Sequence, residues 1–559
     1  MQKEIMIATL INRLQKSVQL HPLDNVLVAL HNLKAGETIY HNTKKIILKS
    51  EVPAKHKFAI HDFKVGDQVM MYGVVIGKAT QAIGAGDPIT TQNLKHDAKG
   101  YEVGASNYQW QAPDVSKWKS ASFMGYHRSD GQVGTRNFWL VVPLVFCENR
   151  NVDYIKNAFA KKLGYAKPDK YEGLVEDLIS EYKKNGVVKS SHLIQENKDV
   201  NDQRLFKNID GIKFLSHSGG CGGTREDSDN LCKLIAGYLN NPNVAGATIL
   251  SLGCQHAQIE ILKQSIEITN SSFDKPLVFF EQQKFLSEEA LLKQAILETF
   301  SMLVNVNNIN REPAPLGKLT IGLKCGGSDG FSGITANPAM GHVSDLLAAL
   351  GGKTILAEFP ELCGVEQELI DRTVNSKIAN KFATLMTAYN GKAEAIGSGF
   401  SMNPSPGNIK DGLITDAMKS AGAAKKGGTS PITDVLNYAE YIHENGLNLL
   451  CTPGNDVEAT TGMAGSGANL IIFSTGLGTP TGNPVAPVIK TSTNSALTKR
   501  LSDLIDFDHG DIITEGKSIE QSGEELLGLI VKISSGEVLT KAEQLQQDDF
   551  IPWKRGVSL

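Results

Sequence analysis

The stretch KLTIGLKCGGSDG, residues 318–330, is a short apolar run that ends in a glycine-rich polar segment. Apolar runs of this length, closed by glycine, are typical of buried strands in parallel sheets. Helical patterns such as Asp229–Leu239 and Glu288–Leu303 lie between further runs of this kind. These runs are FWLVVPLVF (138–146), IKFLSHS (212–218), GATILSLG (246–253) and KPLVFFE (275–281). Strands that alternate with helices predict an α/β fold with largely parallel sheets.

A second α/β region is predicted beyond residues 304–317, VNVNNINREPAPLG, which form the clearest internal boundary. Its strands are KTILAEF (353–359), LNLLCTP (447–453) and ANLIIFST (468–475), with a helix over Gly341–Leu350. Because 559 residues exceed what one hydrophobic core can hold, about three domains are expected.

The N-terminal part differs, because short β-rich runs there alternate with turn-rich segments. The runs are Asn25–Leu30, Lys45–Leu48, Lys57–Ile60 and Val69–Ile76. The sequence therefore predicts an α/β multidomain chain in which a small, mostly-β domain precedes two α/β domains. The expected limits are 18–95 for the β domain, 96–120 for a linker, 121–312 for the first α/β domain and 313–559 for the second.

Composition narrows the functional classes. A net charge of −4 and the lack of a dense Lys/Arg block give no indication of nucleic-acid binding. No run approaches 18 apolar residues, so no membrane span is expected. Residues 1–17 lack the apolar core of a signal peptide and are interpreted as a surface helix or an extended start. Seven cysteines without C-x-x-C pairs favour a reducing, cytoplasmic location.

Four cysteines each follow a predicted strand: Cys147, Cys221, Cys254 and Cys325. The carboxyl ends of parallel strands form the ligand-binding edge of an open sheet, so these thiols are expected to approach one another. A single strand-end cysteine is more often a small buried apolar residue. Thiolates combined with imidazoles would suit Fe²⁺, Zn²⁺ or an iron–sulfur cluster, and the spacing matches no zinc-finger or ferredoxin pattern.

Glycine-, proline- and asparagine-rich loops supply the remaining signal. They are GYHRSDGQVGTRN (125–137), GGSDGFSGITANPAMG (326–341), NPSPGN (403–408), TPGNDVEATTGMAGSG (452–467) and STGLGTPTGNPVAP (474–487). Such loops suit recognition of a hydroxyl-rich acid through several contacts. None has the spacing of a phosphate-binding loop, and GLGTP (476–480) lacks the third glycine of a dinucleotide site, so NAD is not expected.

Several of these segments resemble the signature segments of the altronate/galactarate dehydratase family. They are GYHRSDGQVGTRN, CGGSDGFSGITANPA (325–339), NPSPGN, GLNLLCTPGNDVEATT (446–461) and FSTGLGTPTGNPVAPVIK (473–490). The N-terminal HPLDNVLVAL (21–30), KHKFAI (55–60) and YGVVIGKA (72–79) resemble the family's small β module, the SAF domain. The resemblance covers nearly the whole chain from residue 18, and EFPELCGVEQELIDR (358–372) is more similar to the altronate branch.

The resemblance implies a carbon–oxygen lyase of hexuronate breakdown that converts D-altronate to 2-dehydro-3-deoxy-D-gluconate and water. It also implies a divalent metal, Fe²⁺ or Mn²⁺, and a three-domain subunit able to form a homodimer. The segment SHSGGCGGTREDSD (216–229) is richer in glycine and charge than the altronate type, which bears on the stereochemistry accepted.

Dehydration of a 2,3-dihydroxy acid requires a base for the C2 proton, an acid for the 3-hydroxyl, and stabilisation of charge on the carboxylate oxygens. We expect a metal between His21 and His56 and the thiols of Cys221, Cys254 and Cys325, with His217 as an alternative ligand. His56, Lys57 and His127 are the candidate catalytic residues. Arg128 and Arg136 are expected to bind the substrate carboxylate, because a guanidinium matches it bidentately. Asp329, Asn337, Asn403 and Asn455 are the candidates for the sugar hydroxyls.

Three alternatives stay open. The first is another reaction on the same scaffold, such as dehydration of galactarate or of another 2-hydroxy acid. The second is an iron–sulfur dehydratase with Cys221, Cys254 and Cys325 as cluster ligands. The third is a sugar-acid binding protein without catalysis. Assays for 2-keto acid release, acid-labile sulfide and ligand binding separate the three.

Overall fold

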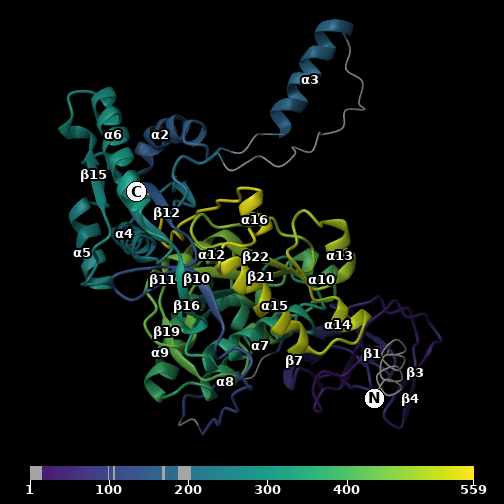
Figure 1. Cartoon of the computed structure of the whole chain (residues 1–559). Coiled ribbons are helices and arrows are strands. Elements are labelled where there is room, and N and C mark those ends of the chain that lie inside the picture. Colours follow the sequence, from purple (N-terminus) through teal and green to yellow (C-terminus); the bar gives the residue numbers. More distant parts are fainter. Residues whose placement is uncertain (1–15, 98–99, 105–106, 167–169, 187–202) are drawn as a thin grey trace.

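The computed structural model describes residues 16–97, 100–104, 107–166, 170–186 and 203–559. Figure 1 shows the small N-terminal domain (purple) at one side of the molecule and the second domain (blue to teal) at the opposite side. The C-terminal domain (green to yellow) lies between them. The predicted arrangement of a β domain followed by α/β regions with parallel sheets is confirmed.

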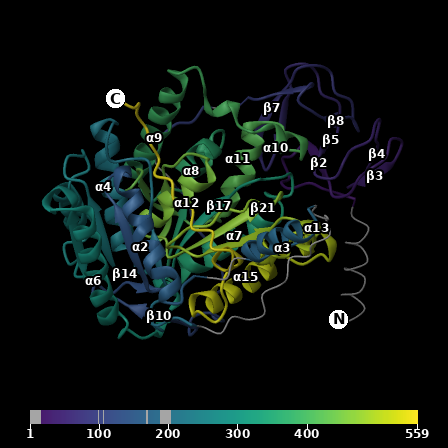
Figure 2. The ribbon, with the colours of Figure 1, turned by 90° about the horizontal axis from the view of Figure 1, so that it is seen from above.

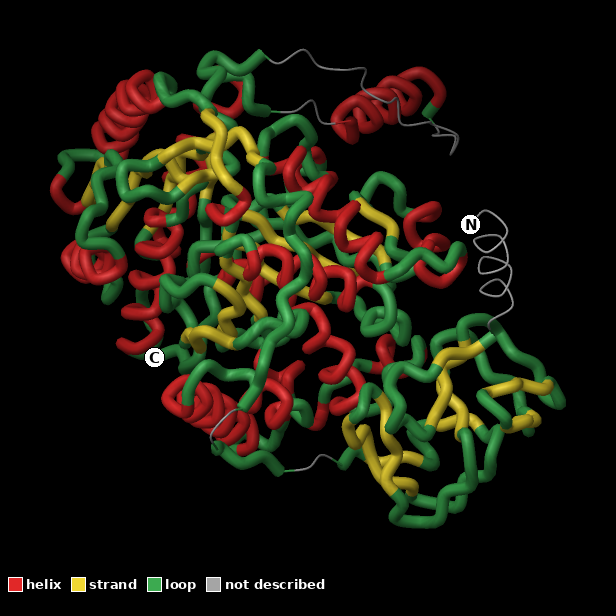
Figure 3. The backbone as a smooth tube through the Cα atoms, turned by 60° about the horizontal axis from the view of Figure 1, so that its bottom comes forward, coloured by secondary structure: helices red, strands yellow, loops and turns green. Residues whose placement is uncertain are grey.

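The small domain consists of strands and turns, without a helix in its described residues, as Figure 3 shows. Its strands are β1 (Ser17–Val18), β2 (Val26–Ala29), β3 (Thr38–His41), β4 (Lys44–Ile47), β5 (Lys57–Ala59), β6 (Gln68–Met71), β7 (Val74–Ala79), β8 (Pro88–Ile89) and β9 (Leu94–Lys95). They form sheets in the orders β1-β2-β5-β8, β3-β4 and β6-β7-β9. The prediction of one strand over Val69–Ile76 is wrong, because Tyr72 and Gly73 adopt positive φ and turn the chain into the β6–β7 hairpin.

The linker, residues 96–121, has no helix or strand in its described part and lies against the C-terminal domain. Tyr108 Oη donates to the carbonyl of Thr429 at 2.5 Å, and Trp110 Nε1 donates to the Thr429 hydroxyl at 3.2 Å. These contacts fix the path of the linker along a surface distant from it in sequence.

The second domain is built on a four-stranded parallel sheet in the order β13-β12-β14-β15. Its elements are β12 (Phe138–Pro143), η1 (Phe146–Glu148), α2 (Asn149–Lys162), α3 (Lys170–Asn185), β13 (Gly211–Phe214), α4 (Arg225–Asn240), β14 (Val244–Ser251), α5 (Ile259–Thr269), β15 (Leu277–Glu281), η2 (Gln282–Lys284) and α6 (Glu288–Val306). An antiparallel sheet, β11 (Val133–Gly134), β10 (Ser122–His127) and β16 (Glu312–Pro315), joins the start of this domain to its end. The expected boundary at residues 312/313 therefore falls inside β16.

The C-terminal domain contains a seven-stranded, entirely parallel sheet in the order β19-β20-β18-β17-β21-β22-β23. Its strands are β17 (Thr320–Cys325), β18 (Lys353–Leu356), β19 (Ile432–Leu436), β20 (Gly446–Leu450), β21 (Leu470–Thr475), β22 (Val488–Ser492) and β23 (Phe507–Asp508). Its helices are η3 (Leu316–Lys318), α7 (Ala336–Ala349), η4 (Phe359–Leu362), α8 (Glu366–Asp371), α9 (Ser376–Glu394), η5 (Phe400–Met402), α10 (Pro406–Lys410), α11 (Asp416–Ala424), η6 (Lys425–Gly427), α12 (Asp456–Gly465), α13 (Ser495–Arg500), α14 (Asp511–Thr514), α15 (Ile519–Ser534) and α16 (Lys541–Gln544).

Helices cover both faces of this sheet, and β17 and β21 lie in its middle (Figure 2). Helix α12 contacts β17 and β21 and packs against α4 of the second domain, whereas α7 contacts β17, β18, β20 and β21. One hydrophobic core joins the second domain to the C-terminal sheet, and another joins the small domain to the layer around α7 and α11. The three domains thus share apolar interiors. No helix in the described part of the chain is both long and apolar enough to cross a membrane.

Candidate active site

The carboxyl edge of the seven-stranded sheet contains the point at which the strand order reverses. The reversal lies between β17 and β21. From β17 the chain passes to β18 on one side of β17, and after β20 it crosses to β21 on the other side of β17. Ligands of open α/β sheets bind outside the carboxyl ends of strands at such a point. The loops after β17 and β21, residues 326–335 and 476–487, border this point, and the loop after β18, residues 357–365, lies next to them.

A group of buried charges occupies this edge. Lys324, near the end of β17, pairs with the carboxylate of Glu358, which follows β18. Lys426 of η6 donates to the same carboxylate at 2.7 Å. Lys324 also lies 2.8 Å from Asp456, whose side chain is 28% exposed and opens the group toward solvent. Both lysines and Glu358 are essentially without solvent contact.

A second ion pair adjoins the first. Glu361 of η4 lies 2.8 Å from Lys419 of α11, which also donates to Asn403 Oδ1 at 2.9 Å. The thiol of Cys325 connects the two pairs, because it accepts from Lys426 at 2.8 Å and donates to Glu361 at 3.4 Å. We call Lys324, Cys325, Glu358, Glu361, Lys419 and Lys426 the lysine–carboxylate cluster.

The pKa values in the cluster follow from burial opposed by these pairs. Burial acts to lower the pKa of Lys324 and of Lys426, but the neighbouring anionic groups outweigh it and raise both. Burial acts to raise the pKa of Glu361, but Lys419, Lys324 and Lys426 bring it down to about 2. The pKa of Glu358 is raised by burial and by the nearby Glu361. Burial raises the pKa of Cys325 to about 11, so its thiol stays protonated at neutral pH.

Glu358 is held in an unusual backbone conformation. Its φ of 72° is left-handed, which costs a non-glycine residue roughly 1–2 kcal/mol. Its backbone N–H donates to the Thr452 hydroxyl at 3.0 Å, and the following Phe359 packs edge-on against Phe382 at 5.3 Å. Strain of this kind, maintained by surrounding contacts, is concentrated at functional sites. Here it aims a carboxylate at two lysines.

The cluster can bind and stabilise negative charge. Three ammonium groups converge where the dielectric is low, so their attraction for an anion is much stronger than in water. Asp456 is the most exposed group paired with these lysines, so the ion pairs reach solvent at this residue. The arrangement therefore suits chemistry in which a substrate anion gains further charge.

The small domain meets the C-terminal domain beside this edge, at a contact that we call the domain joint: residues 55–57 against 329–330 and 410–412. Lys55, itself at a φ of 76°, lies 2.9 Å from Asp329 and 3.0 Å from Asp411. A Cβ at Gly330 or Gly412 would come within 2.6 Å of the Lys55 carbonyl, so the close approach requires glycine at both positions.

Lys57 is the most unusual group of the domain joint. It is fully buried, and its Nζ donates to the carbonyl of Gly412 at 2.7 Å. Burial lowers the pKa of Lys57 to about 7, against the opposing attraction of Asp329. A lysine with this pKa exchanges protons near neutrality, as a general base or acid must.

The loop 326–330 connects the lysine–carboxylate cluster to the domain joint, because it begins next to Cys325 and ends with Asp329 and Gly330. Asp329 is buried and accepts hydrogen bonds from Thr493 Oγ1 at 3.1 Å and from the Phe331 backbone at 3.1 Å. The hydroxyl of Ser328 is buried and has no hydrogen-bond partner in the described structure. The predicted residues Lys57 and Asp329 are thus brought together, and the cluster adjoins them through this loop.

The predicted metal ligands are not brought together as one group. Cys325 belongs to the cluster, whereas Cys221 and Cys254 are exposed in the second domain. The ring of His21 lies against Gly73 and accepts from the Leu23 backbone at 3.2 Å. His56 is at the domain joint, where its Nε2 contacts the Lys410 carbonyl at 3.1 Å. In the described residues, the potential ligand atoms close to the Cys325 thiol are instead those of Glu358 and Glu361, and all three lie within 4.8 Å of one another.

The alternative ligand His217 is buried in the second domain and forms hydrogen bonds there. Its Nε2 lies 2.7 Å from the Pro143 carbonyl, and burial lowers its pKa to about 4.

Cys147, Cys221 and Cys254 follow three neighbouring strands, β12, β13 and β14, and all three are exposed. Backbone hydrogen bonds of 3.1 and 3.0 Å join the loop of Cys221 to the loops of the other two. The second domain thus has a rim of three thiols on adjoining loops, but these are not among the described groups whose donor atoms all lie within 4.8 Å of one another.

The two arginines predicted to bind substrate are part of the scaffold, which corrects that expectation. Arg136 is buried and forms a bidentate pair with Glu543 at 2.7 and 3.0 Å. Arg128 donates to the Pro242 carbonyl at 2.8 Å and to Asn137 at 3.0 Å. Their donors hold the antiparallel sheet and the α16 segment in place. His127 is exposed on β10, where its ring contacts the Pro313 carbonyl at 3.2 Å, and it is not part of the cluster.

The three predicted asparagines have different environments. Asn337 is buried, donates to the Gly422 carbonyl and accepts from Ser474, so its amide is used within the fold. Asn455 caps α12 by accepting from two backbone N–H groups. Asn403 contacts Lys419 and therefore adjoins the cluster. Only Asn403 of the three is placed near the buried charges by its described contacts.

Five charged residues of the cluster escaped the sequence analysis. They are Lys324, Glu358, Glu361, Lys419 and Lys426. A signal was present for Lys324 and Glu358, since each interrupts or closes an apolar run that becomes a buried strand. A charge in such a position must find a buried partner. Lys419 and Lys426 lie in a short helix and a turn, where lysine usually reaches solvent.

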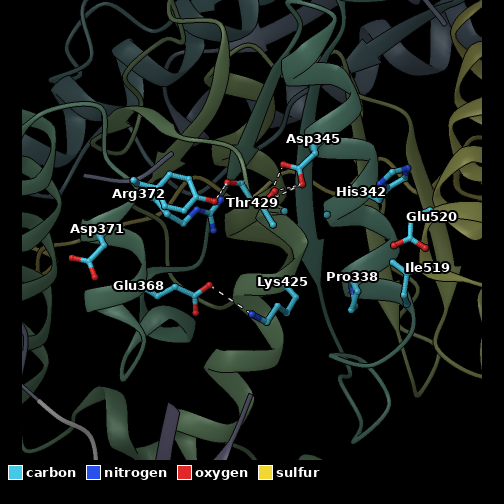
Figure 4. Close-up of a pocket in the computed structure, with 13 residues that line it drawn as sticks. Pro338, His342, Asp345, Glu368, Asp371, Arg372, Lys425, Thr429, Ile519 and Glu520 are labelled. Atoms are coloured by element: carbon cyan, nitrogen blue, oxygen red, sulfur yellow. Dashed lines mark hydrogen bonds and ion pairs between the residues drawn. The ribbon is translucent and has the colours of Figure 1, made fainter. Parts of the chain in front are cut away.

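A cavity lies on another side of η6 from the cluster. It has a volume of about 470 Å³ and is lined by residues of α7, α8, η6 and α15 (Figure 4). Lys425 faces this cavity, 3.6 Å from Glu368, whereas the adjacent Lys426 points into the cluster. Asp345 accepts from the backbone of Thr429 and Ser430, and Arg372 donates to carbonyls. Its principal charges are thus used within the fold, and the cavity is not the candidate active site.

Comparison with known proteins identifies the family. Family models match residues 15–97 (altronate/galactarate dehydratase SAF domain), 125–307 (D-galactarate dehydratase/altronate hydrolase, second domain) and 316–558 (D-galactarate/altronate dehydratase, C-terminal). An altronate dehydratase of Escherichia coli is 33% identical over 97% of this chain and 99% of its own length. The chain belongs to the altronate/galactarate dehydratase family.

Two further members of the altronate/galactarate dehydratase family are similar over most of their length. An altronate dehydratase of Bacillus subtilis is 31% identical over 97% of this chain and 99% of its own. A galactarate dehydratase (L-threo-forming) of Escherichia coli is 29% identical over 94% of both chains. The predicted family is therefore confirmed, and the activity that this membership carries is dehydration of a sugar acid by a hydro-lyase.

Proposed function

We propose that this chain dehydrates D-altronate to 2-dehydro-3-deoxy-D-gluconate and water. Two altronate dehydratases share its full length. The observation that carries the proposal is the lysine–carboxylate cluster at the strand-reversal point, because it provides buried positive charge for an acid that must ionise further. Galactarate, the substrate named for a third relative, is the alternative.

In the proposed mechanism, the substrate carboxylate displaces Asp456 and is held by Lys324, with Lys426 beside it. Removal of the C2 proton places additional charge on the carboxylate oxygens, which these ammonium groups stabilise more strongly than in the ground state. The C2–H electron pair forms the C2=C3 bond while the C3–O bond breaks, and a proton delivered to that oxygen completes the water. The resulting enol then becomes the 2-keto acid.

Lys57 is our candidate base for the C2 proton. Its pKa of about 7 leaves a large neutral fraction at neutral pH, and its amine has one hydrogen bond, to Gly412. Asn403, next to Lys419, and the unpartnered hydroxyl of Ser328 are candidates for reading the sugar hydroxyls. His56 remains a candidate at the domain joint, where we expect its replacement by alanine to lower turnover at least about a hundredfold without unfolding the chain.

A divalent metal, Fe²⁺ or Mn²⁺, was expected for this reaction. Carboxylate ligands suit both ions. Within the cluster, however, Glu358 is paired with Lys324 and Lys426, and Glu361 with Lys419. A dication at Cys325, Glu358 and Glu361 would face three ammonium groups, so the cluster as arranged does not fit one. No step of the mechanism is therefore assigned to a metal, and metal dependence remains a proposal for the assay.

The test is 2-keto acid release from a panel of aldonates and aldarates under reducing conditions. We expect D-altronate to give the highest kcat/KM, and a higher value for galactarate would overturn the substrate assignment. Chelation and dialysis, followed by addition of Fe²⁺ or Mn²⁺, test metal dependence. Full turnover by a protein shown to be metal-free would refute that dependence while leaving the dehydration intact.

The rim of three thiols favours a second candidate, an iron–sulfur dehydratase. The cysteine set differs from the predicted one, since Cys147 replaces Cys325 beside Cys221 and Cys254. Three thiolates can hold a cluster that leaves one iron free for a ligand. Anaerobic purification would then give a brown protein with acid-labile sulfide, lost on Cys221→Ser. A colourless, fully active preparation would exclude this candidate.

We also propose a cytoplasmic location and a homodimer. All seven cysteines lie in the described part of the chain and all are free thiols, which suits a reducing compartment. Light scattering coupled to gel filtration measures the oligomeric state, and a monomer at working concentration would overturn the dimer.

A further inference from the structure

A second group of potential metal ligands lies apart from the cluster. His96, Cys363 and Asp416 each offer one donor atom, and these atoms all lie within 4.8 Å of one another. His96 follows β9 at the end of the small domain, Cys363 follows η4, and Asp416 is the first residue of α11. Three segments distant in sequence thus bring an imidazole, a thiol and a carboxylate to one point.

The buried carboxyl group of Asp416 is the main reason to expect a bound ion here. Its side chain is buried, and apart from the neighbouring Cys363 thiol neither carboxylate oxygen has a hydrogen-bond partner in the described structure. No ion pair in the described residues involves Asp416 or the nearby Glu366. An uncompensated buried carboxylate costs several kcal/mol, so such groups are normally paired or coordinate a metal. A cation is the partner that this position lacks.

Burial shifts the pKa values of all three candidate ligands. Burial, followed by the Asp416 and Glu366 carboxylates, raises the pKa of Cys363. Burial raises the pKa of Asp416 to about 8, although Lys419 acts in the opposite direction. Burial lowers the pKa of His96, so its imidazole is neutral at neutral pH, the form that binds metals. The three donor groups are therefore mainly uncharged at neutral pH before a metal binds.

We propose that His96, Cys363 and Asp416 bind a divalent ion of the Zn²⁺ class. The combination of thiolate, imidazole and carboxylate suits Zn²⁺ or Fe²⁺, whereas Mg²⁺ and Ca²⁺ prefer oxygen ligands alone. Water or Glu366 supplies the fourth ligand. Glu366 is close enough to affect the Cys363 thiol, and it accepts from the Gly364 backbone at 2.7 Å. Binding releases the protons of the Cys363 thiol and the Asp416 carboxyl group to solvent.

The position of the site gives the metal a structural role. Cys363 lies two residues after Glu361, and Asp416 lies three residues before Lys419. These neighbours form the 2.8 Å ion pair of the lysine–carboxylate cluster. A metal at the three ligands therefore ties η4 to α11 next to that pair and fastens both to the end of the small domain. This consequence for catalysis rests on the proposed function, but the metal binding itself does not.

The test uses the full chain, treated with a chelator and then titrated with Zn²⁺ or Co²⁺. We expect one bound equivalent, a higher melting temperature, and with Co²⁺ a thiolate charge-transfer band. Cys363→Ser should abolish the band, and Asp416→Asn and His96→Gln should weaken Zn²⁺ binding at least tenfold. His31→Gln, at an exposed position of the small domain, is the matched control and should bind as the parent does.

The proposal is overturned if the parent chain binds no Zn²⁺, or if Cys363→Ser keeps both the Co²⁺ band and the affinity. Binding that is lost instead with Cys221→Ser would place the metal at the second-domain thiols and also overturn it. Should Cys363→Ser fail to fold, the Zn²⁺ affinities of Asp416→Asn and His96→Gln decide, because unchanged affinity in both folded variants would overturn the proposal. None of these readouts depends on altronate turnover, so failure of the metal site and failure of the proposed reaction are distinguishable.

Discussion

Lys426→Met is expected to lower kcat/KM for D-altronate by about a thousandfold, the loss typical of removing one pre-organised group that stabilises developing charge. Methionine keeps most of the length of the side chain but leaves Glu358 and Cys325 without the ammonium that contacts both. Because a buried carboxylate loses a partner, the free energy of unfolding should also fall by about 3–5 kcal/mol. Steady-state kinetics and thermal melts followed by circular dichroism measure the two effects.

The adjacent lysine supplies the control. Lys425 belongs to the same turn but faces the cavity, and its pair with Glu368 is long and partly exposed. Lys425→Met should therefore change stability by at most about 1 kcal/mol and leave turnover close to that of the parent. If Lys426→Met folds and retains near-normal kcat/KM, the cluster is structural and the proposed mechanism is wrong.

Lys57→Met is expected to lower turnover by about 10²–10⁴-fold and to remove a titration from the pH–rate profile. With a pKa of about 7 the amine becomes neutral as pH rises, so the rate of the parent enzyme should increase through this pH if Lys57 is the base. The variant should lack this ascending limb. Lys78→Met, a partly exposed position of the same domain, should keep it.

Stability provides an independent check on Lys57. Its folded pKa lies below its ordinary value of 10.5, so between about pH 7 and 10.5 the unfolded chain binds more protons than the folded chain. The free energy of unfolding of the parent should therefore rise with pH across this window relative to Lys57→Met. Parallel stability curves for the two proteins would show that Lys57 is not buried as a neutral amine.

The fold was largely predictable because its signals are local. Runs such as 246–253 and 468–475 are mostly apolar and bounded by turn residues, which is typical of strands buried on both faces. The short antiparallel strand β16 was missed, since its prolines are unfavourable for a central strand and its partner β10 is distant in sequence. Pairing between such segments depends on the tertiary fold.

The candidate site was predictable only in part. Lys57 and Asp329 were identified from motifs that the sequence displays. The side-chain partners of Lys324, by contrast, are Glu358, which follows β18, and Asp456 of α12, and no spacing in the sequence relates these segments. Arg128 and Arg136 show the opposite error, because a guanidinium in a glycine-rich loop is equally suited to a substrate and to backbone carbonyls. Long-range packing decides between the two.

The shared hydrophobic cores affect how the molecule comes apart. Side chains of the small domain are part of the same apolar interior as α7 and α11, and α4 of the second domain completes the interior behind β21. Separating either domain from the C-terminal domain would expose a large hydrophobic surface to water. Each of these domains also has a hydrophobic core of its own, but without the C-terminal domain its shared apolar side chains would be exposed, so we infer that each is less stable alone than in the whole chain.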